Sequence, residues 1–357
     1  MFQEVLLLIA GIYLAWSLGA NDAGNIISTA VGSKSISFKK AMVFFVFCLA
    51  FGTIFLSKNV IKTVSSGIVD AEVITINHAI IALFVAASWV HFATWKKWPV
   101  SISQSVVSSV LGIGIVESLS STHQLVHWQT VLTLAGVWLF SPILGFIAAW
   151  LIFKVVHGFV RHRHLYFKDS LRDLFDHPIQ TISEYFSGDL RRREKIFKVF
   201  MLLSSGYMAI ALGASTIAST TALVYSGFDG RDSVLGVPLN ATDTLLLMKL
   251  IVLVSVILGI LTYGEKLIDF LGNRLVKLNA LRGATVQASA ATVIVISALM
   301  GYPVSSTGVF VGSFLGMDSG EDHPHMKSHA ASSLKMAFLV TIPVTAVLSG
   351  VLTWLIL

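Results

Sequence analysis

A carboxylate and two amides lie at the end of the first apolar stretch of the chain. Asn21, Asp22 and Asn25 follow an uncharged run that extends from about residue 5 to residue 20. A carboxylate at membrane depth costs several kcal/mol unless it faces a cavity or a partner, so Asp22 is a candidate functional residue. Carboxylate and amide oxygens form a ligand set suited to Na⁺. The same carboxylate could carry a proton, or could simply cap a helix.

Two segments in different parts of the chain share an aromatic–Pro–Val–Ser frame. They are WPVSISQSVVSSVLGIG (Trp98–Gly114) and YPVSSTGVFVGSFLGMD (Tyr302–Asp318). Because proline is tolerated in the first turn of a helix, each segment predicts a helix that begins at its serines. Unpaired first-turn N–H groups bind phosphate or sulfate without any Arg or Lys. The predicted anion ligands are Ser101, Ser103, Gln104, Ser305, Ser306 and Thr307; ordinary capping is the alternative interpretation.

A second pair of segments indicates that the chain is an internal duplication. SLGANDAGNIISTA (Ser17–Ala30) is similar to ALGASTIASTTALV (Ala211–Val224), 194 positions later, and the Pro-Val-Ser segments are 204 positions apart. We therefore divide the chain into a first transmembrane repeat at 1–156, a cytoplasmic loop at 157–195 and a second repeat at 196–357. In the second repeat the residues predicted to serve the coupling cation are hydroxyls, namely Ser215, Thr216 and Ser219.

Composition places these residues in a multi-pass membrane protein. Of the 357 residues, 55% are hydrophobic and 12% are charged, whereas soluble domains carry about 25% charged residues. Long apolar runs recur along the chain, which predicts transmembrane helices. The net charge of +6 is concentrated in segments such as RRREK (Arg191–Lys195), which is typical of cytoplasmic loops rather than of nucleic-acid binding. By the same rule the N-terminus faces outside.

The predicted fold class is an all-α integral membrane protein. Duplicated halves with interrupted apolar segments favour an inverted-repeat transporter bundle with two re-entrant helical hairpins and a substrate site at the repeat interface. The sequence contains neither GxSxG nor HExxH, so an enzyme is not expected. A passive channel and a structural membrane protein are the alternative classes.

On these motifs the sequence resembles the PiT family of inorganic phosphate transporters. The quoted residues are Gly19-Ala20-Asn21-Asp22 with Asn25, the segment KNVIKTVSSGIVDAE (Lys58–Glu72) and both Pro-Val-Ser segments. The resemblance implies an inverted-repeat fold, uptake coupled to Na⁺ or H⁺, and a homodimer. It also implies that Asn21, Asp22 and Asn25 serve the coupling ion and the substrate, while the serines and threonine of the two hairpins hold the anion.

The sequence departs from the family pattern at several positions. The second copy of the Gly-Ala-Asn-Asp motif reads Gly213-Ala214-Ser215-Thr216, and Gln104 and Gly308 stand where the family has His. Losing a carboxylate acceptor disfavours phosphate, which donates a hydrogen bond, more than sulfate, which is fully ionised. Because Asp22 is intact, we predict a cation-coupled phosphate transporter, with a sulfate permease as the alternative. It would lie in the lipid of the cell membrane and need no cofactor beyond Na⁺ or H⁺.

Overall fold

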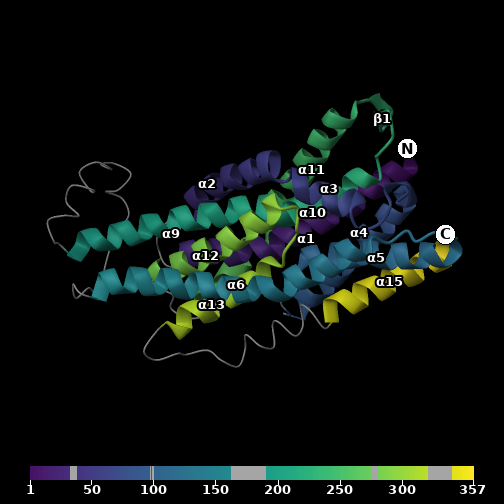
Figure 1. The fold of residues 1–357 in the computed structure, drawn as a ribbon. Helices are drawn as coiled ribbons and strands as arrows, with labels where there is room; N and C mark the ends of the chain where they lie inside the picture. The colour runs from purple at the N-terminus through teal and green to yellow at the C-terminus, as the bar shows by residue number, and fades with distance from the viewer. Residues whose placement is uncertain (33–37, 97, 99, 162–189, 275–279, 321–339) are drawn as a thin grey trace.

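The protein is a bundle of long helices in a computed structural model (Figure 1). The structure describes residues 1–32, 38–96, 98, 100–161, 190–274, 280–320 and 340–357, without the side chains at 23–32, 38–41, 156–161, 190–195, 263–274 and 280. Most of the predicted cytoplasmic loop lies outside these residues. The elements are α1 (Phe2–Gly32), α2 (Phe38–Phe51), η1 (Gly52–Leu56), α3 (Lys58–Ser66), η2 (Ala71–Val73), α4 (Ile76–Trp95), α5 (Ile102–Ser120), α6 (Trp128–Arg161), α9 (Leu190–Leu212), η3 (Gly213–Ile217), α10 (Ala218–Ser226), β1 (Ser233–Val234), β2 (Val237–Pro238), α11 (Ala241–Arg274), α12 (Ala280–Leu299), α13 (Ser306–Ser319) and α15 (Ile342–Ile356).

Seven helices in the described part of the chain are long and apolar enough to cross a membrane. Met42–Leu56 and Lys58–Ser66 would make an eighth span if they are taken together, although they are bent by 61°. Backbone polar groups in lipid must be bonded within their own segment, which is why these apolar runs fold as helices. The prediction of an all-α, multi-pass membrane protein is therefore confirmed. The 14 residues of α13 rise only about 21 Å, which is short of the roughly 30 Å hydrocarbon layer.

The two halves of the chain pack crosswise. α1 makes its longest contact with α11, and the continuous α9–η3–α10 segment packs against α2, η1 and α3. Glycines permit both crossings. A Cβ atom at Gly19 would lie 2.1 Å from the Val256 carbonyl oxygen, and one at Gly213 would lie 2.5 Å from the Leu49 carbonyl oxygen. Because real Cβ atoms do not approach backbone this closely, only glycine fits at either position.

Each half also contains a helical hairpin beside its crossing. α4 packs against α5 in the first half, and α12 packs against α13 in the second. The second helix of each hairpin lies along a further helix, so that α5 contacts α15 and α13 contacts α6. Glycine again sets the distance, since a Cβ atom at Gly112 or at Gly312 would lie 2.0 Å from a carbonyl oxygen of the partner helix. The pairing of elements is thus equivalent in the two halves.

The ends of the bundle differ in what they carry. Both termini and the β1–β2 hairpin lie at one end in Figure 1, whereas α6 ends and α9 begins at the opposite end. The point where the basic segment joins the bundle is therefore far from the N-terminus. Nearly all helices contribute to one continuous apolar core, which contains the starts of α5 and α13.

Candidate functional site

The first turns of α5 and α13 meet inside the bundle. Ser101 is the N-cap of α5, and its Oγ accepts a hydrogen bond from the Gln104 N–H at 3.3 Å. Ser305 caps α13 in the same way, at 3.0 Å. Thr307 Oγ1 donates to the Val100 carbonyl oxygen at 3.2 Å, which joins one helix start to the other. Two helix N-termini, each the positive end of a dipole, therefore converge in the protein interior.

Asp22 lies at this junction. Its side chain is buried, and its Oδ2 accepts a hydrogen bond from Ser306 Oγ at 2.7 Å. This bond connects α1 to the first turn of α13. The other oxygen, Oδ1, has no hydrogen-bond partner among the described residues. A buried carboxylate oxygen without a partner costs free energy, so the arrangement is one that a cation or a hydrogen-bond donor would complete.

The two amides predicted to act with Asp22 are placed differently. Asn21 is only half-buried, and its Nδ2 donates to Thr94 Oγ1 of α4 at 2.9 Å. Its amide oxygen is therefore the part of the side chain left for an ion. Asn25 lies in α1, but its side chain is outside the described residues. The proposed Na⁺ ligand set of Asn21, Asp22 and Asn25 thus stays a prediction.

Ser103 and Gln104 occupy the first turn of α5 and are completely enclosed. Gln104 is 0% exposed and Ser103 is 1% exposed. Neither the Ser103 hydroxyl nor either polar atom of the Gln104 amide has a hydrogen-bond partner in the described part of the chain. Fewer than a tenth of buried polar groups in proteins lack a partner. Their concentration at one helix start indicates a site for a polar ligand.

The predicted residues of the second half lie at the other crossing. Ser215 and Thr216 are in the π-helix η3, fully buried, and their hydroxyls have no partner within the described segments. Ser219 is used differently, because its Oγ donates to the Ser215 carbonyl oxygen at 2.9 Å. π-turns occur frequently at functional sites. Among the described residues, neither the Ser215 nor the Thr216 hydroxyl forms a hydrogen bond with Asp22, although η3 contacts both α5 and α12.

Sequence analysis missed several buried polar groups. Hydroxyls without a partner in the described residues are also found on Ser17, Ser205, Thr221 and Ser313. A further omission is Lys249, which is 8% exposed within the apolar part of α11 and donates from Nζ to the Ile54 carbonyl oxygen at 3.0 Å. Lys249 could have been recognised from the sequence, because a charged residue within an apolar span is costly. The serines could not, because small hydroxyl residues are common in apolar helices.

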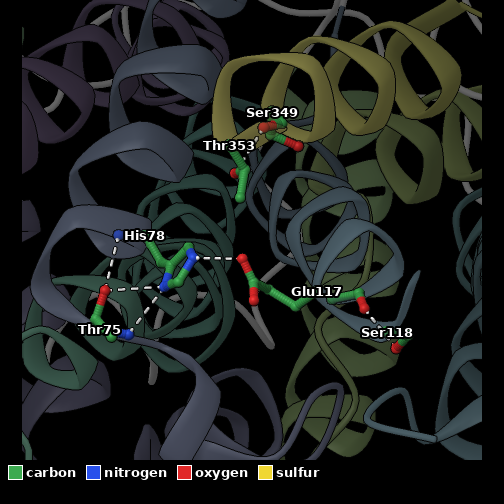
Figure 2. A network of polar contacts seen from close by, with 7 residues as sticks. Thr75, His78, Glu117, Ser118, Ser349 and Thr353 are labelled. Carbon is green, nitrogen blue, oxygen red and sulfur yellow. Dashed lines mark hydrogen bonds and ion pairs between the residues drawn. The ribbon is translucent and has the colours of Figure 1, made fainter. Parts of the chain in front are cut away.

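A separate polar network connects α4 to the far end of α5 (Figure 2). His78 Nε2 lies 3.2 Å from Glu117 Oε1, and the Thr75 N–H donates to His78 Nδ1 at 3.2 Å. Nδ1 also lies 2.9 Å from Thr75 Oγ1, so the ring is held between Thr75 on one side and Glu117 on the other. The pair fixes the α4–α5 hairpin at the end opposite to the enclosed first turn.

The apolar helices of the bundle enclose polar side chains without described partners at two converging helix starts. This arrangement is typical of multi-pass membrane transport proteins. The chain belongs to the phosphate transporter family, whose sequence profile matches residues 18–349. A family of transporters is not an enzyme family.

Individual relatives agree with this assignment. The chain is 27% identical to a Thermococcus kodakarensis protein named "Putative phosphate permease", over 97% of this chain and 95% of the relative. It is 22% identical to "Inorganic phosphate transporter 2-1, chloroplastic" of Arabidopsis thaliana, over 98% of this chain and 71% of the relative. The solved structure entitled "The sodium-dependent phosphate transporter" has the same fold, with a TM-score of 0.82, 24% identity and full coverage of both chains.

Proposed function

We propose that this protein is a secondary-active transporter that carries phosphate across the cell membrane together with a cation. The observation that carries the proposal is the hydrogen bond from Ser306 to Asp22, which brings a buried carboxylate to the helix start where an anion would bind. Membership of the phosphate transporter family supports phosphate as the substrate. The enclosed polar groups of Ser103 and Gln104 support the start of α5 as the other half of the site.

The need for a cation follows from electrostatics. Two unit negative charges about 4 Å apart repel by roughly 4 kcal/mol at an effective dielectric constant of 20. Phosphate beside an ionised Asp22 would suffer this repulsion unless a cation or a proton neutralised the carboxylate. Anion and cation would then bind interdependently, each increasing the affinity for the other. This linkage is what a symporter requires.

Sodium is the coupling ion that we favour over the proton. Asp22 Oδ1 is free of partners in the described residues, and the amide oxygen of Asn21 is the nearest sequence neighbour that could join it. Oxygen ligands of this kind suit a hard cation. The related solved structure is titled as a sodium-dependent protein, which points to the same ion.

The equivalent packing of the two halves supports an inverted repeat with alternating access. α1 with α11 corresponds to α9–η3–α10 with α2–η1–α3, and the α4–α5 hairpin corresponds to the α12–α13 hairpin. α13 is too short to span the membrane alone. A short helix of this kind is expected in a re-entrant hairpin. The site would lie between the halves and open to each side in turn. The homodimer implied by the family resemblance stays a prediction, for which the mass of the protein in detergent is the measurement.

Uptake of radiolabelled phosphate into proteoliposomes tests the proposal. We expect accumulation against a gradient when the outside solution contains Na⁺, and loss of accumulation when choline replaces Na⁺. A protonophore separates the two coupling ions, since it would abolish proton-driven but not Na⁺-driven uptake. Accumulation of sulfate in place of phosphate would identify the alternative substrate. Equal flux with and without any cation gradient would show a passive channel and overturn the proposal.

A further inference from the structure

At the proposed anion site, both polar atoms of the Gln104 side chain lack a hydrogen-bond partner among the described residues. Gln104 is fully buried in the first turn of α5. Its backbone N–H is capped by Ser101, so only the side-chain amide is left to act. Burying an amide without a hydrogen-bond partner is energetically unfavourable. An unpaired amide at this position is therefore matched to a ligand that both donates and accepts.

The first turn of α13 carries no amide side chain in the equivalent place. The residue 204 positions after Gln104 is Gly308, which is also the third residue of its helix after the N-cap. The helix starts therefore supply similar backbone N–H groups and hydroxyls, whereas the amide is supplied by α5 alone. An anion held between the two helix starts would therefore meet an amide side chain on the α5 side only.

Two of the acceptors that lack a partner among the described residues, Asp22 Oδ1 and Gln104 Oε1, differ in charge. Asp22 Oδ1 belongs to a carboxylate, which the proposed function assigns to the coupling cation. Gln104 Oε1 belongs to a neutral amide, which can accept a hydrogen bond from an O–H group of the bound anion. Phosphate carries at least one P–O–H group near neutral pH, whereas sulfate carries no hydrogen. A sulfate ion could accept from Gln104 Nε2 but would leave Oε1 facing oxygen lone pairs.

We propose that Gln104 is the residue that distinguishes phosphate from sulfate, because its Oε1 accepts from the P–O–H group while its Nε2 donates to an unprotonated phosphate oxygen. The inference rests on the proposed function and assigns the specificity of that same site. Sites built to bond a substrate hydroxyl reject analogues that lack it far more strongly than apolar pockets do. Arsenate, which also carries an O–H group near neutral pH, should be accepted like phosphate.

The test uses three anions and a near-isosteric variant. Gln104→Met keeps the length of the side chain and removes both the donor and the acceptor. Phosphate uptake into proteoliposomes gives the KM for phosphate and the inhibition constants of arsenate and sulfate. In the unmodified protein we expect phosphate and arsenate to bind at least about 100-fold more tightly than sulfate. In Gln104→Met we expect the phosphate and arsenate constants to rise by about tenfold or more while the sulfate constant stays unchanged.

Further variants keep the test decisive. Gln104→His retains one donor and one acceptor on a ring and should keep most of the preference for phosphate. Gln129→Leu replaces an exposed glutamine at the start of α6 and should change no constant. If Gln104→Met does not fold, as judged by gel filtration, the Gln104→His constants and phosphate-dependent thermal stabilisation of that variant decide the question.

The outcomes for the inference and for the proposed function are separable. If the unmodified protein accumulates no phosphate, the proposed function fails. If it accumulates phosphate but Gln104→Met changes the phosphate and sulfate constants by the same factor, or changes neither, only the role of Gln104 is overturned. A loss of the phosphate preference in Gln104→His would equally contradict the assignment, because that side chain can still accept and donate.

Discussion

The two helix crossings of this protein share their packing but not their chemistry. At the first, α1 crosses α11 where Gly19 faces Gly259, and at the second, η3 crosses η1 where Gly213 faces Gly52. Three residues after its glycine, the first crossing carries the carboxylate of Asp22, and the second carries the hydroxyl of Thr216. Close backbone contact has been kept in both places, while the acidic group is present in one.

The second crossing also differs in its backbone. Both of its helices contain a π-turn, Gly52–Leu56 in one and Gly213–Ile217 in the other, and the two turns contact each other. Near them Lys249 donates to the Ile54 carbonyl oxygen, and a π-turn disturbs the regular bonding of such carbonyls. The position 207 residues before Lys249 is Met42, just as Gly52 is 207 residues before Gly259. Asp22 and Lys249 thus both lie on helices of the first crossing, α1 and α11, whereas the equivalent positions of the second crossing are Thr216 and Met42. The symmetric scaffold therefore carries its ionisable side chains asymmetrically.

The largest expected effect separates the two crossings directly. Asp22→Asn removes the charge that the coupling cation would neutralise, and we expect Na⁺-driven phosphate uptake to fall by about 100-fold or more. Thr216→Val is nearly isosteric and removes only a hydroxyl without a described partner, so from packing alone uptake should change by no more than about threefold. A larger loss would support the coupling-cation role that the sequence predicts for Thr216. Both measurements use proteoliposomes with equal protein content. Equal losses in the two variants would mean that the crossings are functionally equivalent.

Substitution of the glycines tests whether the packing is as similar as it looks. Gly19→Ala and Gly213→Ala each force a Cβ atom into backbone of the neighbouring helix, and overpacking of this kind costs roughly 1–3 kcal/mol. We expect both to lower the thermal unfolding midpoint in detergent.

Gly136 provides the control for these substitutions. It lies in α6, and a Cβ atom there would meet nothing within 4 Å. Gly136→Ala should therefore stabilise the helix by about 0.5–1 kcal/mol, because alanine loses less conformational entropy. A midpoint that is unchanged in Gly213→Ala but lowered in Gly19→Ala would show that only the first crossing is tightly packed.

The placement of most elements could be predicted from sequence, because each depends on a local signal. Apolar runs near 41–57, 73–93 and 243–262 coincide with α2–η1, α4 and the span of α11. The starts of α5 and α13 were signalled by serines that cap their own helices. Asp22 stood out because a carboxylate in an apolar segment is costly.

Other features depend on contacts between distant parts of the chain. Ser103 and Ser105 are two positions apart in the same helix, yet Ser105 donates to the Ser101 carbonyl oxygen at 2.8 Å, whereas the Ser103 hydroxyl has no described partner. Nothing in the local sequence separates them. The turn of Asn21 toward Thr94 and the bond from Lys249 to Ile54 likewise follow from packing across many residues.

Lys249 gives a third and smaller test of the electrical asymmetry. At an effective dielectric constant of 20, a unit positive charge attracts a unit anion by roughly 1–2 kcal/mol for an illustrative separation of about 10 Å. Lys249→Met introduces the residue found at the equivalent position, Met42. This variant should therefore have a KM for phosphate that is severalfold higher. Lys249→Arg keeps the charge and should preserve the KM. A rise in both variants would assign the effect to the π-turn that Lys249 supports rather than to its charge.

The smallest expected effect extends the comparison from the crossings to the hairpins beside them. His78 of α4 corresponds to Arg282 of α12, 204 positions later, so one hairpin begins with an imidazole and the other with a guanidinium group. His78→Phe removes the donor to Glu117 and the acceptor for the Thr75 N–H, which should lower stability by about 1 kcal/mol.

Glu117→Gln is the matched variant, because its amide oxygen can still accept from His78 Nε2. It should leave both the unfolding midpoint and the KM for phosphate nearly unchanged. The pair lies at the end of α5 that is remote from Gln104, so a purely positional role predicts that His78→Phe changes the midpoint but not the KM. A change in KM without a change in midpoint would instead connect this end of the hairpin to the transport cycle, and the two hairpins would then differ in function as the two crossings do.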